Sequence, residues 1–260
     1  MKLLLYSLIF ILPMTACQTQ SQPWPGNKEA AISLSFDDAR ESQVLIGTGL
    51  LDSFGVKATF YVIPSGVQKQ IEGWKKAVAR GHEIGNHTLT HPCSGNFSWS
   101  RNNALENYTL DKIRYELTEC NRQIKELLNA DVKTFAYPCG QKYVGSGTNT
   151  LSYVPMVAEL FRTGRGYKED NANDPLFCNL SQLSSFEIDG RSFEEILPVI
   201  EEARKNKAWI IFGGHEINKD GVQTTKLETL TKLLAYAKDP ANKIWIETVS
   251  NVEKYISSKK

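Results

Sequence analysis

Only four histidines occur in the 260-residue sequence, and three of them fall in one stretch, GHEIGNHTLTH. The fourth, His215, follows the apolar run AWIIF. His87 and His91 are four residues apart, a spacing that lets two imidazoles face one cation from a helical turn or a tight loop. With Asp38 they would form a two-histidine, one-carboxylate site that leaves positions open for water and substrate. By spacing alone, a solvated histidine pair on a helix is the alternative.

The elements that would position these residues follow from the pattern of short apolar runs. Stretches between the runs carry apolar stripes, over 113–127 and 227–237, that are typical of amphipathic covering helices. Eight runs have strand character, namely 31–36, 57–63, 82–87, 133–138, 160–164, 184–188, 208–212 and 243–249. The alternation predicts an α/β fold, a distorted (β/α) barrel of seven or eight strands. A dinucleotide-binding or P-loop fold is excluded, because neither glycine-rich signature is present.

Charge gives no reason to expect nucleic acid as a partner. Lysine and arginine number 30 against 29 acidic residues, with no long run of one sign. Residues 1–17 read as a signal peptide that ends in a lipobox-like Met-Thr-Ala-Cys, with Cys17 lipidated; an ordinary secretory signal or a short anchor helix are the alternatives. Residues 18–28 are predicted to be a flexible tether and 29–260 the folded domain. We therefore expect an exported protein, lipid-anchored in the cell envelope.

Four cysteines remain after Cys17, an even number in a chain expected to reach an oxidising compartment. They are Cys93, Cys120, Cys139 and Cys178. Up to two disulfides in three pairings are possible, and the sequence does not choose among them. A reduced, buried thiol is an alternative for Cys120, which lies on the apolar face of a predicted helix.

Taken together, these motifs resemble those of the polysaccharide deacetylases, the NodB-homology domain of carbohydrate esterase family four. The likeness spans about residues 31–256. Ser35-Phe36-Asp37-Asp38 is similar to the first family motif, and His87-Thr88-Leu89-Thr90-His91 to the second. Residues 135–140, FAYPCG, stand in the place of the third motif and indicate a subgroup with FAYPxG strings, and residues 211–215 stand in the place of the fifth.

The resemblance implies a role for each charged residue of these motifs. Asp38, His87 and His91 would hold one divalent ion, zinc first, with cobalt or nickel as alternatives. Asp37 would be the general base that takes the proton of a water, and His215 the general acid that protonates the leaving group. Because adjacent strand residues face opposite ways, the two aspartates can act separately only if the chain turns out of its strand there.

The third motif implies the part of the site that contacts the acyl group. By resemblance, the backbone amide of Cys139 would stabilise the oxyanion, within a substrate-binding turn that also contains Tyr137, Pro138 and Gly140. The alternative is that the Cys139 thiol acts as a nucleophile. Sugar rings pack on aromatic faces, and Trp99 and Tyr143 are the favoured candidates for this contact among Trp99, Tyr108, Tyr143, Tyr167 and Trp245.

Departures from the family pattern leave specific gaps. Ala136 stands where the third motif usually carries an arginine that orients the base, and Arg165 is a possible substitute, with a salt-bridged surface arginine as the alternative. The fourth motif is not identifiable, and Asp189 is a guess for its aspartate. Gly213 replaces a leucine that usually helps to wall the acetyl pocket. His82 has no family role and is predicted to be structural.

The resulting hypothesis is a metal-dependent hydrolase that removes acetyl groups from a carbohydrate. The substrate would be an N-acetylated glycan such as peptidoglycan, chitin oligomers or an exopolysaccharide, or an O-acetylated sugar polymer, and the sequence does not separate amide from ester. A catalytically weakened, glycan-binding lipoprotein on the same fold is the alternative. The sequence leaves the oligomeric state open.

Overall fold

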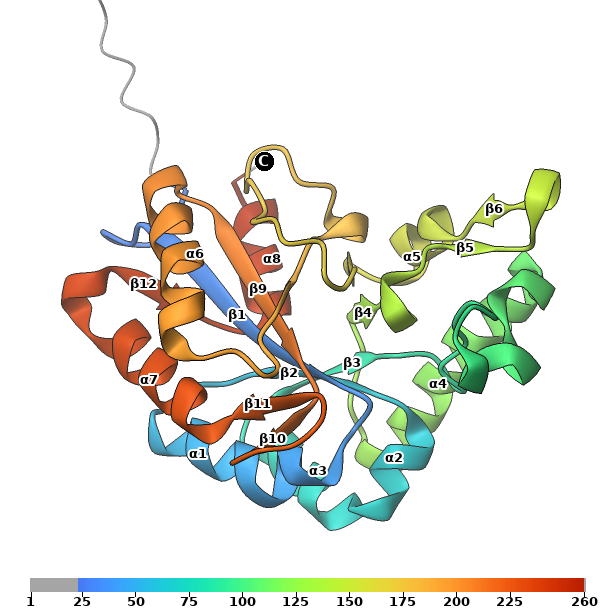
Figure 1. The fold of residues 1–260 in the computed structure, drawn as a ribbon, viewed down its shortest axis with the longest axis horizontal. Coiled ribbons are helices and arrows are strands. Elements are labelled where there is room, and N and C mark those ends of the chain that lie inside the picture. The colour runs from blue at the N-terminus through green and yellow to red at the C-terminus, as the bar shows by residue number, and fades with distance from the viewer. Residues whose placement is uncertain (1–22, 260) are drawn as a thin grey trace, which may run out of the picture.

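A curled parallel sheet lies at the centre of the computed structural model, which describes residues 23–259 (Figure 1). Its strands are β1 (Ala30–Asp37), β2 (Thr59–Val62), β3 (Glu83–Asn86), β4 (Thr134–Ala136), β7 (Thr163–Arg165), β8 (Phe186–Glu187), β9 (Trp209–Gly214) and β12 (Ile244–Ile246). They are arranged in the order β7-β4-β3-β2-β1-β9-β8, and β12 pairs with the start of β1. All eight coincide with the predicted runs, and the predicted α/β fold, a distorted barrel, is confirmed.

The barrel is incomplete, because β7 and β8 end the strand order and do not pair as strands. The segment before β8 spans the gap between them. Arg165 forms an isolated parallel bridge with Leu183, and the Gly166 amide donates to the Leu183 carbonyl over 2.8 Å. Three residues later, Phe186 pairs with Phe212 of β9. The distortion is therefore a short segment that replaces a regular closing strand pair.

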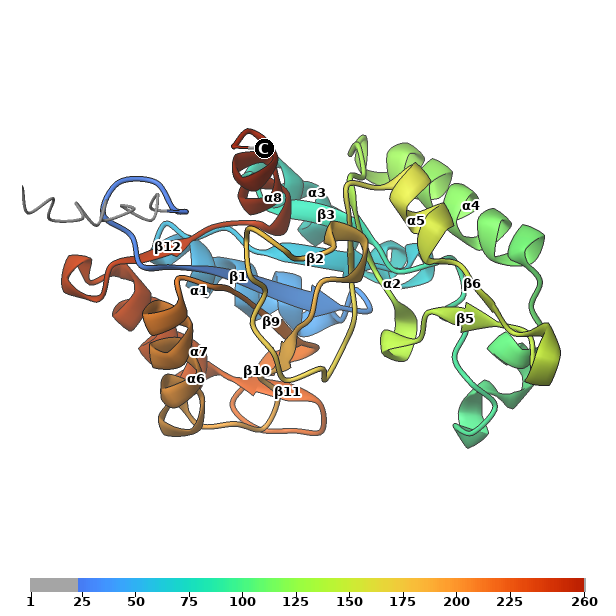
Figure 2. The same ribbon diagram turned by 90° about the horizontal axis from the view of Figure 1, so that it is seen from above.

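Helices cover the outside of this sheet. They are α1 (Thr48–Ser53), α2 (Pro64–Lys69), α3 (Ile71–Ala79), α4 (Leu110–Leu128), α5 (Val154–Leu160), α6 (Phe193–Asn206), α7 (Leu227–Lys238) and α8 (Val249–Ser257). Shorter helical segments are Gln43–Gly47, Ser98–Asn103, Leu105–Asn107, Pro138–Gly140, Gly147–Asn149, Leu180–Gln182 and Pro240–Asn242. Figure 2 shows α6 and α7 beside the half of the sheet that holds β1 and β9, and α4 and α5 beside the other half.

Helix α4 shows why these segments fold as the pattern predicts. Its stripe of Ile113, Leu117, Cys120 and Ile124 is fully buried, because these residues recur at the period of one helix face. The Thr109 hydroxyl accepts a hydrogen bond from the Lys112 amide at 3.2 Å and caps the first turn. The helix ends at Asn129 in the left-handed conformation.

Strand β1 places the first motif on the inner face of the curled sheet. Ile32, Leu34 and Phe36 point outward into the main apolar core under the helices. Successive strand residues face opposite sides, so the alternate residues Ser33, Ser35 and Asp37 point inward. The Ser33 hydroxyl accepts a hydrogen bond from the buried Trp209 indole at 3.0 Å, and the Ser35 hydroxyl donates to a β9 carbonyl at 2.8 Å. The polar alternation of SLSFD therefore builds the inside of the barrel.

Two strand pairs were not anticipated from the sequence. The first, β5 (Tyr143–Val144) with β6 (Leu151–Ser152), forms a hairpin in the loop that follows the third motif. The second joins β10 (Glu216–Asn218) to β11 (Thr224–Lys226), directly after His215. The strands of both pairs are only two or three residues long, which is too short to show the alternation of apolar and polar residues that marks a strand.

At the N-terminus, the packed chain begins earlier than predicted. Trp24 is buried against Trp245, with ring centroids 6.1 Å apart, and its indole donates to the Lys207 carbonyl at 2.9 Å. A large apolar ring within the segment 18–28 explains why the last part of the predicted tether packs on the domain. The predicted signal peptide and Cys17 lie outside the described residues. Within residues 23–259, no helix is long and apolar enough to cross a bilayer.

Candidate active site

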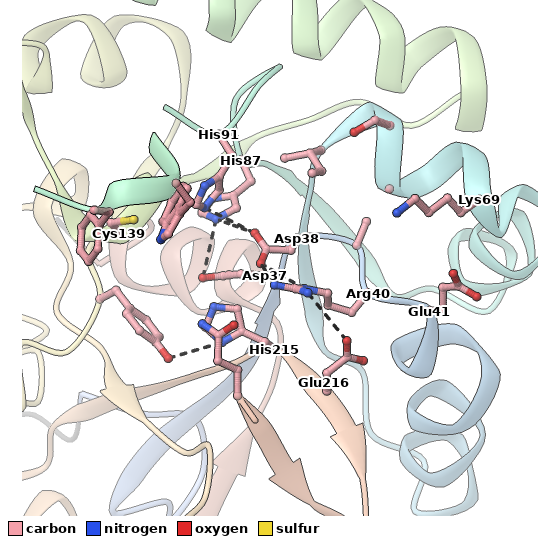
Figure 3. Close-up of a pocket in the computed structure, with 18 of the residues that line it drawn as sticks. Asp37, Asp38, Arg40, Glu41, Lys69, His87, His91, Cys139, His215 and Glu216 are labelled. Atoms are coloured by element: carbon pink, nitrogen blue, oxygen red, sulfur yellow. Dashed lines mark hydrogen bonds and ion pairs between the residues drawn. The ribbon is translucent and has the colours of Figure 1, made fainter. Parts of the chain in front are cut away.

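The predicted catalytic and metal-binding residues meet in one cleft of about 910 Å³, at the carboxyl ends of the strands. Asp37 ends β1 and Asp38 follows it, His87 and His91 follow β3, and His215 follows β9. Figure 3 shows both imidazoles of the second motif directed at the two aspartates, with His215 on the other side of Asp37. Segments separated by more than one hundred residues in the sequence thus bring these five side chains together in one site.

The adjacent aspartates point to different partners, as predicted from the turn at the end of β1. Asp38 has φ +73° and Ala39 φ +55°, so the chain leaves the strand in the left-handed region at once. This conformation is disfavoured for residues that carry a Cβ. Asp37 remains on the inner face of the sheet and bonds Arg165, whereas Asp38 reaches His87 and His91.

Asp38, His87 and His91 have the geometry of a metal site. The Asp38 Oδ1 atom lies 3.5 Å from His87 Nε2 and 3.4 Å from His91 Nε2. All three ligand atoms lie within 4.8 Å of one another, so one cation could contact each of them. The other ring nitrogen of His87 lies 2.8 Å from the Ala136 carbonyl, a contact that orients the ring as in zinc proteins. The donor set therefore fits a divalent ion with open positions.

A tight turn holds the two histidines in place. Thr88 and His91 both have positive φ, +65° and +54°. The Thr88 amide donates to the Asn86 side chain at 2.7 Å, and the Thr88 hydroxyl accepts from the His91 amide at 2.9 Å. Buried Glu116 of α4 accepts from the amide and hydroxyl of Thr90 at 2.8 and 2.7 Å. These bonds hold a conformation that costs on the order of 1–3 kcal/mol per strained residue.

Electrostatics keep Asp38 and His91 near neutral pH in the protonation states that metal binding requires. Burial raises the pKa of Asp38, but the nearby imidazoles of His87 and His91 outweigh it and lower the pKa to about 2. Burial, together with His87, lowers the pKa of His91 to about 4. Asp38 is therefore ionised, and His91 is neutral with a lone pair available.

Arg165 is the buried partner of Asp37. Its Nη2 donates to Asp37 Oδ1, and its Nη1 donates to the Gly166 carbonyl at 3.0 Å. The other Asp37 oxygen lies 3.9 Å from His87 Nε2, facing the candidate donor set. Arg165 is the register partner of Ala136 across β4 and β7, so an arginine on either strand would sit at the same level of the barrel. The structure thus places a guanidinium on Asp37 one strand away from the position that the resemblance implied.

His215 is joined to Asp189, the residue offered as a guess for the fourth motif. Its Nδ1 lies 2.7 Å from Asp189 Oδ2, and its amide donates to Asp189 Oδ1 at 3.2 Å. Thr225 of β11 also donates to Oδ1, at 2.7 Å. Burial lowers the pKa of His215, but the bond to Asp189 and the charge of Asp37 outweigh it, so the net shift is upward. A raised pKa favours the protonated imidazole that a general acid needs.

A disulfide links the turns of the second and third motifs. Cys93 and Cys139 are bonded, 46 residues apart, which answers the pairing question left open by the sequence. Cys139 has φ +54°, and the amides of Gly140 and Gln141 are bonded within the turn, to Tyr137 and Pro138 carbonyls. The thiol of Cys139 is consumed, so the alternative of a cysteine nucleophile is wrong for this state. Buried Cys120 keeps a free thiol.

Other residues of the predicted substrate turn lie away from the cleft. Of these residues and Arg165, Cys139 alone lines it; Tyr137 and Pro138 are buried, and the Tyr137 hydroxyl donates to the Ser181 carbonyl at 2.7 Å. The Tyr137 side chain packs in an apolar core with other aromatic rings and with Val157 of α5, and so it does not face the cleft. Gly140 packs on the Tyr167 backbone, which a Cβ would approach to 2.9 Å.

The aromatic candidates for sugar contact also divide into residues that line the cleft and residues that lie elsewhere. Trp99 and Tyr167 line the cleft, whereas the other favoured candidate, Tyr143, is exposed outside it. Tyr108 is buried, and Trp245 packs between Trp24 and Tyr255. His82 is structural, as predicted. Its Nδ1 accepts from the Ala58 amide at 3.2 Å, and burial lowers its pKa to about 4.

Two site residues were missed from the sequence. The buried Gln43 side-chain amide donates to the carbonyls of Asp37 and His215, at 2.7 and 2.8 Å. It thereby joins the carboxyl end of β1 to the carboxyl end of β9. Arg40 donates to Asp38 Oδ2 from Nε and Nη2, at 3.2 and 2.9 Å. Arg40 lies two residues after the first motif and could have been considered, whereas nothing about Gln43 in the sequence marks it.

Fold and site together define a class: an α/β barrel with a candidate metal and acid–base site at the carboxyl ends of its strands. The sequence model of the family described as polysaccharide deacetylase matches residues 25–153, about half of the chain. Residues 25–153 are thus similar to the polysaccharide deacetylase family, and the first and second motifs both lie within the matched residues.

Curated relatives are similar over limited stretches. A peptidoglycan-N-acetylglucosamine deacetylase of Bacillus cereus is 38% identical over 93 residues, which cover 34% of this chain and 41% of the relative. A gellan lyase of a Bacillus species is 24% identical over 253 residues, 89% of this chain but 10% of the relative. This chain thus spans less than half the length of either relative.

Solved structures share the fold over most of the chain. A putative polysaccharide deacetylase from Mycobacterium smegmatis superposes with a TM-score of 0.65 at 15% identity, over 91% of this chain and 93% of the other. A protein from Bacillus anthracis described as a carbohydrate esterase family four pseudoenzyme gives 0.56 at 16% identity, over 87% and 66%. At these identities the likeness concerns the fold.

Proposed function

We propose that this protein is a metal-dependent hydrolase that removes acetyl groups from a carbohydrate. The observation that carries the proposal is the convergence, in one cleft, of the Asp38, His87 and His91 donor set with two separate acid–base pairs. A site for binding alone would have no use for both a buried carboxylate and a hydrogen-bonded imidazole beside the donor set.

The chain's own residues divide the work of the reaction. A divalent ion held by Asp38, His87 and His91, zinc in our proposal, would activate water and polarise the acyl carbonyl. Asp37, oriented by Arg165 through one oxygen, takes the proton of the attacking water with the other. His215, held by Asp189, gives a proton to the departing nitrogen or oxygen. The Cys139 amide donates to the charge that develops on the carbonyl oxygen.

Acetate release tests this proposal directly. Purified protein should free acetate from at least one member of a panel containing chitin oligomers, peptidoglycan and acetylated xylan. A chelator should stop the release, and added zinc, cobalt or nickel should restore it. Restoration by none of these metals, with the fold intact, would contradict the metal-dependent mechanism.

A glycan-binding protein without turnover is the second candidate, favoured by one observation: a fold relative is described as a pseudoenzyme. It predicts glycan binding with no acetate release from any substrate of the panel. Export and a lipid anchor at Cys17 remain part of the proposal. Labelling of cells with a radioactive fatty acid should mark the wild-type protein and leave the Cys17→Ala variant unmarked.

A further inference from the structure

Two exposed aromatic rings stand at the edge of the cleft, where no residue of the described range 23–259 covers them. Phe97 is 42% exposed and Trp99 62% exposed, and both line the cleft. Their rings are stacked, with centroids 5.5 Å apart and an interplanar angle of 28°. Apolar surface held in water in this way lowers its free energy when a ligand covers it.

The loop that carries these rings is held firmly. Cys93 is bonded to Cys139, and the Ser100 hydroxyl both accepts from the Cys93 amide at 3.0 Å and donates to its carbonyl at 2.8 Å. Across the loop, the Glu106 carboxylate accepts from the Ser94 hydroxyl at 2.5 Å and the Gly95 amide at 2.9 Å. Such a loop loses little conformational entropy when a ligand binds.

Its position relates the aromatic pair to the candidate active site. The Trp99 ring lies 5.9 Å from the ring of His91, tilted by 33°. Three of the charged residues that line the cleft, Arg40, Glu41 and Lys69, lie on the opposite side of Asp38 from His91 (Figure 3). The aromatic side of the cleft therefore suits an uncharged ligand with an apolar face.

We infer that Phe97 and Trp99 form a subsite for a neutral pyranose ring, the unit next to the sugar that loses its acetyl group. Pyranose rings present C–H groups on one face, and flat aromatic rings are their usual partners. This inference rests on the proposed function, because it makes the occupant a second unit of the same glycan. It assigns the protein to oligomeric or polymeric substrates in preference to single sugars.

A comparison of substrate lengths tests the subsite. The wild-type protein should have a higher kcat/KM for the β-1,4-linked tetramer of N-acetylglucosamine than for the monosaccharide. Trp99→Ala should lower this tetramer-to-monomer ratio about tenfold, the loss expected for one stacking contact, and Trp99→Phe should retain most of it. Tyr115→Ala is the matched control, since Tyr115 is 59% exposed on α4 and does not line the cleft.

Direct binding separates failure of the subsite from failure of the proposed function. Calorimetry of the zinc-loaded Asp37→Asn variant with the tetramer should give an affinity about tenfold higher than that of Asp37→Asn/Trp99→Ala. If the wild type releases no acetate but this difference appears, the subsite stands and the hydrolase proposal fails. An unchanged ratio in Trp99→Ala, or no tetramer binding to Asp37→Asn, would overturn the subsite.

Discussion

Replacing Arg165 with alanine removes the partner of the buried carboxylate that we assign as the base. The Arg165 side chain is fully buried and Asp37 is 3% exposed, so the variant leaves a buried carboxylate without its charged partner. Removal of one partner from a buried ion pair costs about 3–5 kcal/mol of stability. Ordinary domains have an unfolding free energy of roughly 5–15 kcal/mol, so a domain in the upper part of that range stays folded after such a loss and its activity can be measured.

Activity should fall more than stability alone would explain. Arg165 fixes one Asp37 oxygen and leaves the other directed toward the donor set, so the variant loses orientation of the base. General base catalysis contributes about 10²- to 10⁴-fold, which bounds the expected fall in kcat. Urea unfolding and acetate release measure the two effects. Arg114→Ala is the control, because the Arg114–Glu159 pair is exposed and should contribute about 1 kcal/mol or less.

The strand register provides a rescue. Ala136 and Arg165 are paired across β4 and β7, and both are buried, so the Arg165→Ala/Ala136→Arg variant places a guanidinium at the same level from the neighbouring strand. We expect it to recover part of the lost activity. The reasoning is refuted if Arg165→Ala keeps more than about a tenth of the wild-type kcat. It is also refuted if the folded double variant gains no activity over the single one.

Further predictions concern the other parts of the site. Asp37→Asn should abolish acetate release and leave the bound metal, measured by elemental analysis, nearly unchanged; loss of metal would mean that the two aspartates have exchanged roles. The protonated form of His215 is lost as pH rises through its raised pKa, so Asp189→Asn, which removes the main cause of that increase, should move the alkaline limb of the kcat profile to lower pH. An unmoved limb would exclude His215 as the acid. Replacing Cys93 and Cys139 with serine, which opens a closure of 46 residues, should lower stability by about 4 kcal/mol in urea unfolding, and a reducing agent should then have no further effect.

The sheet was predictable from the sequence because its signal is local. Buried parallel strands read as short apolar runs, and every strand of the main sheet coincides with one such run. The short pairs β5–β6 and β10–β11 were missed, since two or three residues cannot establish a period of two. Trp24 was assigned to a tether for a related reason. A single ring in a polar, proline-bearing segment carries no pattern, and its burial depends on Trp245 far along the chain.

Contacts within the site were most predictable where a motif names both partners, although Arg165 and Asp189 were also anticipated. The donor set of Asp38, His87 and His91 follows from motif spacing, and the structure brings these residues together. The Cys93–Cys139 bond does not follow, because pairing depends on where two loops meet in space. The bonds of Gln43 to two strand ends were equally hidden, since glutamine has no preference for such a position.

The departures from the family pattern at Ala136, in the third motif, and at Gly213, in the fifth, are both related to the segment that holds Arg165 and Tyr167. Arg165 faces Asp37, which compensates for Ala136, and Tyr167 follows two residues later. A Cβ on Gly213 would approach the Tyr167 ring to 3.2 Å, so the absence of a side chain there is what lets the ring pack against β9 and meet His215 edge-on at 5.3 Å. One short segment at the end of β7 therefore supplies a guanidinium beside Asp37 and an aromatic ring beside Gly213. By the resemblance, the corresponding arginine and the leucine of the acetyl pocket would come from the third and fifth motifs, on β4 and β9. The two departures are therefore consistent with a rearranged site, in which Arg165 and Tyr167 stand in for the side chains missing at Ala136 and Gly213.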